Sequence, residues 1–176
     1  MTGRILPAGE VRDSEPWESG SKTAAATLLL APNPSAWTLD GTNTWLLSSP
    51  GSGQTIVVDP GPADLAHLEL IVAQALAVDS PVTTILLTHG HADHSAGARQ
   101  LAGMTGADVR AVDPEHRLGS EGVVGGEVLT AGSLEVRVVA TPGHTSDSVC
   151  LLVESEGSLL TGDTVLGRGT TVVAWP

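Results

Sequence analysis

The sequence predicts an α/β or α+β domain in which a mixed sheet carries helices on an outer face. Short β-type runs recur along the chain between Gly, Pro and Asp residues. Two helical segments interrupt these runs, which gives the order strands, helix, strand, helix, strands. The length of 176 residues and the hydrophobic content of 41% are sufficient for one domain with its own core.

The expected strands are short, apolar and rich in β-branched residues, and turn residues separate them. They run at 27–30, 44–47, 55–58, 83–87, 109–112, 134–139, 149–153 and 158–160. The strand signals begin near Thr23. We therefore expect residues 1–22 to form a partly flexible N-terminal extension and residues 23–176 to form the domain.

The clearest helix is expected at 64–78, where Asp64 is placed to cap the N-terminus. An apolar stripe near the 3.6-residue period follows it, made of Leu65, Leu68, Ile71, Val72, Ala75 and Leu76. A weaker helix is expected at 96–101, ending in the turn at 103–106. His67 lies one position off the apolar stripe and His116 lies in a charged turn. Both are expected to be ordinary surface histidines, because neither has neighbouring ligands.

The chain is acidic, with 8 Lys and Arg against 20 Asp and Glu, for a formal charge of -12. This charge argues against a general electrostatic grip on nucleic acid or anionic lipid. Two bound divalent cations would add about four positive charges inside one cleft, so the net charge alone does not exclude an RNA substrate there. Phe and Tyr are absent, which leaves the four Trp as base-stacking platforms.

Cys150 is the single cysteine, so the chain cannot form an internal disulfide. Its apolar neighbours predict a buried strand cysteine rather than a reactive one. No apolar stretch approaches the roughly 20 residues that span a bilayer, and we expect no membrane association. The acidic N-terminus does not resemble a signal peptide, so a cytoplasmic location is expected by default.

The most informative segment lies at 88–94 and reads Thr-His-Gly-His-Ala-Asp-His, directly after an apolar run. Neutral imidazole and carboxylate are ligands that zinc accepts, and no cysteine lies nearby to suggest a closed structural site. His89 and His91 are two residues apart and point to the same side of an extended chain. Asp93 and His94 follow where the chain turns into a helix, which directs them to a second point. Gly90 keeps bulk away from the cleft.

Two later segments display metal-type side chains at strand ends. His144 lies on a Pro-Gly turn after one expected strand, and Asp163 follows another. With these residues the chain resembles the metallo-β-lactamase superfamily, whose pattern is His-x-His-x-Asp-His, then an isolated His, then an isolated Asp. Asp59 matches the first, structural Asp motif of that family.

The resemblance implies a four-layer αβ/βα sandwich with the metals in a groove between the two sheet edges. His89, His91 and His144 would hold the first zinc ion. Asp93 and His94 would hold the second, and Asp163 would bridge the two. A narrower similarity at 41–47 and 162–172 is to the lactamase-beta-2-like branch, which includes endoribonucleases acting on single-stranded RNA and thioesterases of polyketide pathways.

One departure concerns the second ion. The superfamily pattern continues with a final Gly-His segment that supplies its last ligand, whereas this sequence stops at Pro176. Three explanations stay open: a fragment lacking the C-terminal part, a separate chain that supplies it, or a weaker second site. An incomplete second sheet would expose an apolar edge and favour association with the missing segment or a homo-oligomer.

The leading hypothesis is a metal-dependent hydrolase that uses a dinuclear zinc-bound hydroxide. Asp93 would orient the hydroxide, and Asp59 or Thr88 would contact the outer nitrogens of the ligating histidines. The substrate would be a small-molecule ester or thioester, or a phosphodiester. The alternatives are an endoribonuclease acting on short single-stranded RNA and a truncated, inactive or structural metal-binding subunit. A β-lactamase is the least expected, since nothing suggests secretion.

Overall fold

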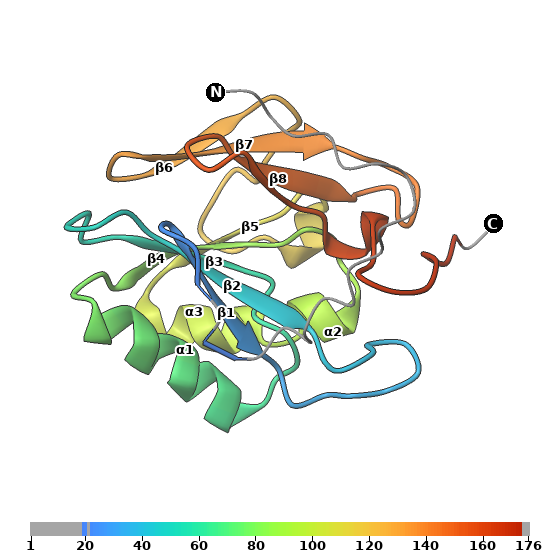
Figure 1. Cartoon of the computed structure of the whole chain (residues 1–176), viewed down its shortest axis with the longest axis horizontal. Coiled ribbons are helices and arrows are strands. Elements are labelled where there is room, and N and C mark those ends of the chain that lie inside the picture. The colour runs from blue at the N-terminus through green and yellow to red at the C-terminus, as the bar shows by residue number, and fades with distance from the viewer. Residues whose placement is uncertain (1–18, 21, 174–176) are drawn as a thin grey trace, which may run out of the picture.

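Two β-sheets face each other in the structure, a computed structural model that describes residues 19–20 and 22–173 (Figure 1). The first sheet has five strands in sequence order. Its strands β1 to β3 pair antiparallel, and β3, β4 and β5 pair parallel. Their bounds are β1 Ala26–Leu30, β2 Asn43–Leu47, β3 Thr55–Val58, β4 Val82–Leu86 and β5 Asp108–Arg110.

The second sheet has four antiparallel strands, also in sequence order. They are β6 Val128–Ala131, β7 Leu134–Ala140, β8 Val149–Val153 and β9 Ser158–Leu160. Consecutive hairpins build this sheet, whereas the parallel pairs of the first sheet need helical crossovers. The two halves of the chain therefore differ in their connections as well as in their strands.

The helices are α1 Leu65–Ala77, α2 Ala92–Ser95 and α3 Ala98–Thr105, with short 3-10 turns η1 at Pro114–His116 and η2 at Gly162–Thr164. Asp64 caps α1 by accepting a hydrogen bond from the backbone N–H of His67 at 2.9 Å. Gly106 ends α3 in the left-handed conformation. Helices α1 and α3 lie against the face of the first sheet that points away from the second sheet (Figure 1).

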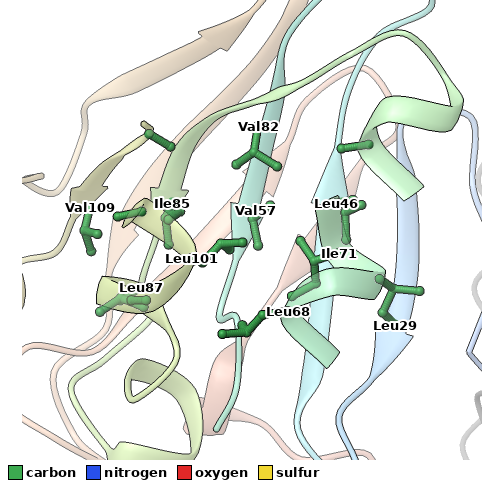
Figure 2. Close-up of a cluster of buried hydrophobic side chains, with 14 of the residues drawn as sticks. Leu29, Leu46, Val57, Leu68, Ile71, Val82, Ile85, Leu87, Leu101 and Val109 are labelled. Atoms are coloured by element: carbon green, nitrogen blue, oxygen red, sulfur yellow. The ribbon is translucent and has the colours of Figure 1, made fainter. Parts of the chain in front are cut away.

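Alternation along the central strands divides the core into two layers. Val57 of β3 points toward the helices, whereas Ile56 and Val58 point into the space between the sheets. Figure 2 shows the helix-side layer, in which Leu68 and Ile71 of α1 pack over the strands. All four β3 residues are buried because both faces of this strand are covered.

Most of the predicted elements are present. The eight expected strands lie within two residues of their observed positions, and the structure adds β6, which was not predicted. Leu65 and Leu76 are exposed rather than part of the buried stripe of α1. Cys150 is buried in β8, as predicted. Of the predicted N-terminal extension, residues 1–18 and 21 lie outside the described residues.

Three of the four expected layers are formed by the described residues: one of helices and two of sheet (Figure 1). The outer face of the second sheet carries no helix within the described ranges. Val139 and Leu159 remain 38% and 49% exposed in this sheet. No helix in the described part of the chain is both long and apolar enough to cross a bilayer.

Candidate metal centre

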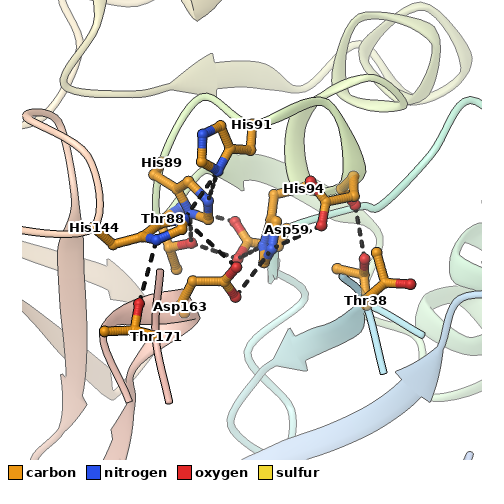
Figure 3. A network of polar contacts seen from close by, with 12 residues as sticks. Thr38, Asp59, Thr88, His89, His91, His94, His144, Asp163 and Thr171 are labelled. Atoms are coloured by element: carbon orange, nitrogen blue, oxygen red, sulfur yellow. Dashed lines mark hydrogen bonds and ion pairs between the residues drawn. The ribbon is translucent and has the colours of Figure 1, made fainter. Parts of the chain in front are cut away.

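Four histidines and an aspartate from both sheets converge at one end of the sandwich (Figure 3). His89 and His91 lie in the loop after β4, and His94 lies on α2. His144 comes from the loop between β7 and β8, and Asp163 from η2 after β9. The first sheet thus contributes the histidine-rich loop, and the second contributes one histidine and one carboxylate.

The first group of donor atoms consists of three imidazole nitrogens, from His89, His91 and His144. Nδ1 of His91 lies 3.0 Å from Nε2 of His89 and 2.9 Å from Nε2 of His144. The three nitrogens therefore surround one point. His89 and His91 point to the same side of the loop, as their spacing predicted.

The second group consists of His89, His94 and Asp163. Nε2 of His94 lies 3.3 Å from Oδ1 of Asp163, and the other oxygen of Asp163 lies 3.6 Å from Nε2 of His144. One carboxylate therefore faces both groups, which is the position that the family resemblance implies for a bridging ligand. That these residues bind metal stays a prediction.

Asp93 lies beside these groups rather than inside either of them. Its Oδ2 is 3.6 Å from Nε2 of His94, and its side chain is 30% exposed. Its position at the start of α2 leaves the carboxylate partly open to solvent. The structure thus brings together five of the six predicted metal ligands and places the sixth, Asp93, against His94.

The donor spacing fits zinc. Ligands at about 2.0–2.1 Å from a tetrahedral ion lie about 3.3 Å from one another. The closest donor pairs in both groups are 2.9–3.3 Å apart. Imidazole and carboxylate are also donors that zinc accepts. The residues present therefore fit a zinc centre in both spacing and chemistry.

Asp59, directly after β3, joins the histidine-rich loop to the sheet beneath it. Its carboxylate accepts hydrogen bonds from the backbone N–H of Thr88 at 2.7 Å and from the Thr88 hydroxyl at 2.6 Å. Nδ1 of His94 lies 2.9 Å from the same carboxylate. Asp59 is 3% exposed and has a φ of 50°, a conformation that a non-glycine residue adopts only under constraint.

These bonds fix which imidazole nitrogens can bind a metal. The Thr88 hydroxyl donates its proton to Asp59, so toward Nδ1 of His89, at 3.1 Å, it can only accept. His89 therefore carries its proton on Nδ1 and presents a lone pair on Nε2. Asp59 likewise takes the Nδ1–H of His94, which directs Nε2 of His94 toward Asp163. The two contacts expected of Thr88 and Asp59 are both present.

The corresponding contact of His144 was not predicted. Its Nδ1 lies 2.6 Å from the carbonyl oxygen of Val172, so the imidazole donates there and turns Nε2 toward His91. The Thr171 hydroxyl lies 3.3 Å from the same nitrogen. A backbone acceptor leaves no mark in the sequence, so only the path of the chain could reveal this contact.

The site holds histidines of opposite character. Burial, followed by the nearby charge of His94, lowers the pKa of His89 to about 4. Burial also disfavours a charged His94, but attraction to Asp59 and hydrogen bonds to Asp163 and Asp59 raise its pKa to about 10. Burial opposes ionisation of Asp163, yet the hydrogen bond from His94 holds the pKa of this carboxyl below its usual value.

Two histidines outside the groups depart from their expected surface positions. His67 is only 3% exposed, because the first turn of α1 places it over Thr44 of β2, whose hydroxyl lies 3.0 Å from Nε2 of His67. His116 is half-buried, and its Nε2 occupies the space that a Cβ on residue 90 would need. Gly90 thus makes room for His116 in addition to allowing the loop to turn.

Comparison with known proteins gives a consistent family. The family model of the metallo-beta-lactamase superfamily matches residues 37–176. An atrochrysone carboxyl ACP thioesterase from Aspergillus fumigatus is 33% identical over 149 residues, which cover 82% of this chain and 46% of that protein. A beta-lactamase-like protein 2 homolog from Drosophila melanogaster is 38% identical over 173 residues, 85% of this chain and 56% of that protein. The chain spans about half the length of these curated relatives.

Solved structures share the fold. ETHE1 from Myxococcus xanthus superposes with a TM-score of 0.66 and 28% identity, over 82% of this chain and 60% of that one. A metallo-beta-lactamase family protein from Thermus thermophilus gives a TM-score of 0.72 and 25% identity, over 86% and 63% of the two chains. The two facing sheets and the helix layer are therefore those of the metallo-beta-lactamase fold.

Proposed function

The chain belongs to the metallo-beta-lactamase superfamily, and we propose that it is a metal-dependent hydrolase acting on a thioester. The observation that carries the proposal is the convergence of three imidazole nitrogens within 3.0 Å of their neighbours. The outer nitrogens of His89 and His144 are held by hydrogen bonds that turn Nε2 of each ring toward the other donor atoms. Such a set is suited to binding a metal ion rather than to stabilising the fold.

We assign two zinc ions to the centre. His89, His91 and His144 would hold the first, His94 and Asp93 the second, and Asp163 would face both. When bound, the ions would supply Lewis acidity and lower the pKa of a water molecule toward neutrality. Asp93, whose side chain is 30% exposed, would accept a hydrogen bond from that water and orient it toward the substrate carbonyl.

A thioester is favoured over RNA by composition and by the relatives. The formal charge of -12 and the absence of Phe and Tyr give little to hold a phosphate backbone or stack bases. The relative from Aspergillus fumigatus is named as an acyl carrier protein thioesterase. A small acyl thioester needs neither a basic surface nor a stacking platform. A cytoplasmic location belongs to the same proposal.

The test compares metal-loaded wild-type chain with Asp93→Asn and, as a matched control, Asp113→Asn. Both substitutions remove one carboxylate charge, but Asp113 belongs to neither donor group; it caps η1, and Asn can also cap. We expect the wild type to hydrolyse a short S-acyl thioester, Asp93→Asn to lose at least about 100-fold in kcat, and Asp113→Asn to match the wild type. Metal content is measured on each protein.

The other outcomes discriminate among the remaining readings. Turnover of short single-stranded RNA without thioester turnover would indicate an endoribonuclease. Turnover of a chromogenic cephalosporin alone would indicate a β-lactamase. Fewer than one zinc per chain with no turnover would favour a structural or inactive subunit. Unchanged thioester turnover in fully loaded Asp93→Asn would contradict the role given to Asp93.

A further inference from the structure

A series of buried hydrogen bonds lies beneath the metal centre, and none of the residues that form it is a metal ligand. It runs from His67 on α1, through Thr44 on β2, to the backbone of Asp59. Nε2 of His67 lies 3.0 Å from the hydroxyl of Thr44, which lies 2.7 Å from the carbonyl oxygen of Asp59. The exposed fractions of these residues are 3%, 0% and 3%. Hydrogen bonds at such a depth are costly to leave unmade.

The direction of each bond follows from the available donors. A carbonyl oxygen only accepts, so the Thr44 hydroxyl donates to Asp59. The hydroxyl then accepts from His67, which must carry a proton on Nε2. Burial lowers the pKa of His67, consistent with a neutral imidazole in this tautomer. The backbone N–H of His67 is itself held by Asp64, the cap of α1.

Asp59 needs such support because its backbone is in the left-handed region. A non-glycine residue there is strained and persists only where its surroundings fix it. The N–H of Asp59 donates to the carbonyl of Leu86 at 3.0 Å, and Thr44 holds the carbonyl on the other side of the residue. These two bonds therefore fix the peptide groups on either side of the Cα that carries the carboxylate.

We propose that His67 is a positioning residue that, through Thr44, fixes Asp59 and thereby orients both halves of the metal centre. The Asp59 carboxylate bonds directly to His94 but reaches His89 only through Thr88. Substitution of His67 should therefore weaken the binding of the second ion more than that of the first. The proposal rests on the proposed metal binding and deepens it.

The test measures the two zinc dissociation constants by competition with a chromophoric chelator. His67→Leu removes the donor, whereas His67→Gln keeps a donor N–H at the distance of Nε2. Thr44 is the next residue in this series of hydrogen bonds. Thr44→Val removes its hydroxyl, whereas Thr44→Ser keeps it. Ile71→Ala is the control for stability, since Ile71 is fully buried on the same helix but packs in the hydrophobic layer.

We expect His67→Leu and Thr44→Val to lower the affinity for the second zinc about tenfold and the affinity for the first by less. A loss of about tenfold is at the low end of what outer contacts of a metal site contribute. His67→Gln and Thr44→Ser should stay within about threefold of the wild type. Ile71→Ala should unfold at lower temperature with both zinc affinities unchanged. The cobalt(II) absorption spectrum of His67→Leu should differ from that of Ile71→Ala.

Wild-type zinc affinity in folded His67→Leu would overturn the proposal. An equal loss in His67→Leu and Ile71→Ala would also overturn it, because the effect would then follow general stability. If His67→Leu does not fold, Thr44→Val decides in the same way. A wild-type chain that takes up less than one zinc would instead contradict the metal centre itself, so the two failures are distinguishable.

Discussion

The two donor groups of the candidate metal centre differ in their chemistry. The group of His89, His91 and His144 contains only imidazoles, and burial keeps His89 neutral, with a pKa of about 4. The second group places His94 between the carboxylates of Asp59 and Asp163, which raise its pKa to about 10. At neutral pH, His89 is ready to bind a metal, whereas His94 must first release a proton.

If the two groups bind ions as proposed, this contrast gives the two ions unequal affinities. Four residues separate His89 from His94 in the sequence, yet the first sits under Thr88 and the second against carboxylates. Without a metal, the proton on His94 supplies the positive charge between Asp59 and Asp163. The predictions that follow probe this difference, beginning with the residue that supports both groups.

The largest effect is expected for Asp59→Ala. The substitution leaves the Thr88 N–H and Nδ1 of His94 without a partner in a buried site. We expect a loss of about 3–5 kcal/mol in the free energy of unfolding, as for other broken buried pairs. We also expect both zinc ions to bind more weakly. Urea unfolding and zinc titration measure the two effects. A loss below about 1 kcal/mol would show that Asp59 does not support the site.

Substitutions in the two donor groups should affect the binding of the two ions separately. His144→Ala removes a donor from the first group, and His94→Ala removes one from the second. We expect each to weaken its own zinc by more than about 100-fold and the other zinc by much less. Titration with a chelator of matched affinity resolves the two equivalents. If both substitutions weakened the same equivalent, the division into two groups would be wrong.

In the metal-free chain, the opposite pKa shifts of His89 and His94 should appear as two different dependences of stability on pH. The raised pKa of His94 gives stability that is fully present below pH 6.5 and is lost as the pH rises through about 10. The lowered pKa of His89 gives stability that is present above pH 6.5 and is lost as the pH falls toward about 4. Urea midpoints across this range measure both limbs. His94→Gln should remove the alkaline limb, and a surviving limb would assign it elsewhere.

The smallest effect is expected for Arg168→Gln. Both terminal guanidinium nitrogens of Arg168 contact Asp40, at 2.8 and 2.9 Å, but the two side chains are each 59% exposed. Exposed ion pairs contribute little because solvent screens them. We expect the midpoint of thermal unfolding to change by less than about 1 °C and the zinc affinities not at all. A clear loss of zinc would show that this contact shapes the site.

The sequence predicts most of the strands because alternation and turn residues are local signals. It also predicts which side chains gather, since five of the six proposed ligands meet although they are spread along the chain from His89 to Asp163. The burial of His67 could not be read from helical spacing, because Thr44 arrives from a distant strand. Strand β6 was missed although Val128–Ala131 alternates and Gly132 begins a turn.

We propose that this chain holds two zinc ions in unequal groups, and calorimetric zinc titration at pH 6 and pH 8 is the direct test. His94 is protonated at both pH values without metal, so binding there must displace a proton. We predict two equivalents at pH 8, with the second binding about 100-fold more tightly at pH 8 than at pH 6 and the first changing less. Fewer than one equivalent at pH 8, or the same pH dependence for both ions, would rule out two unequal zinc sites.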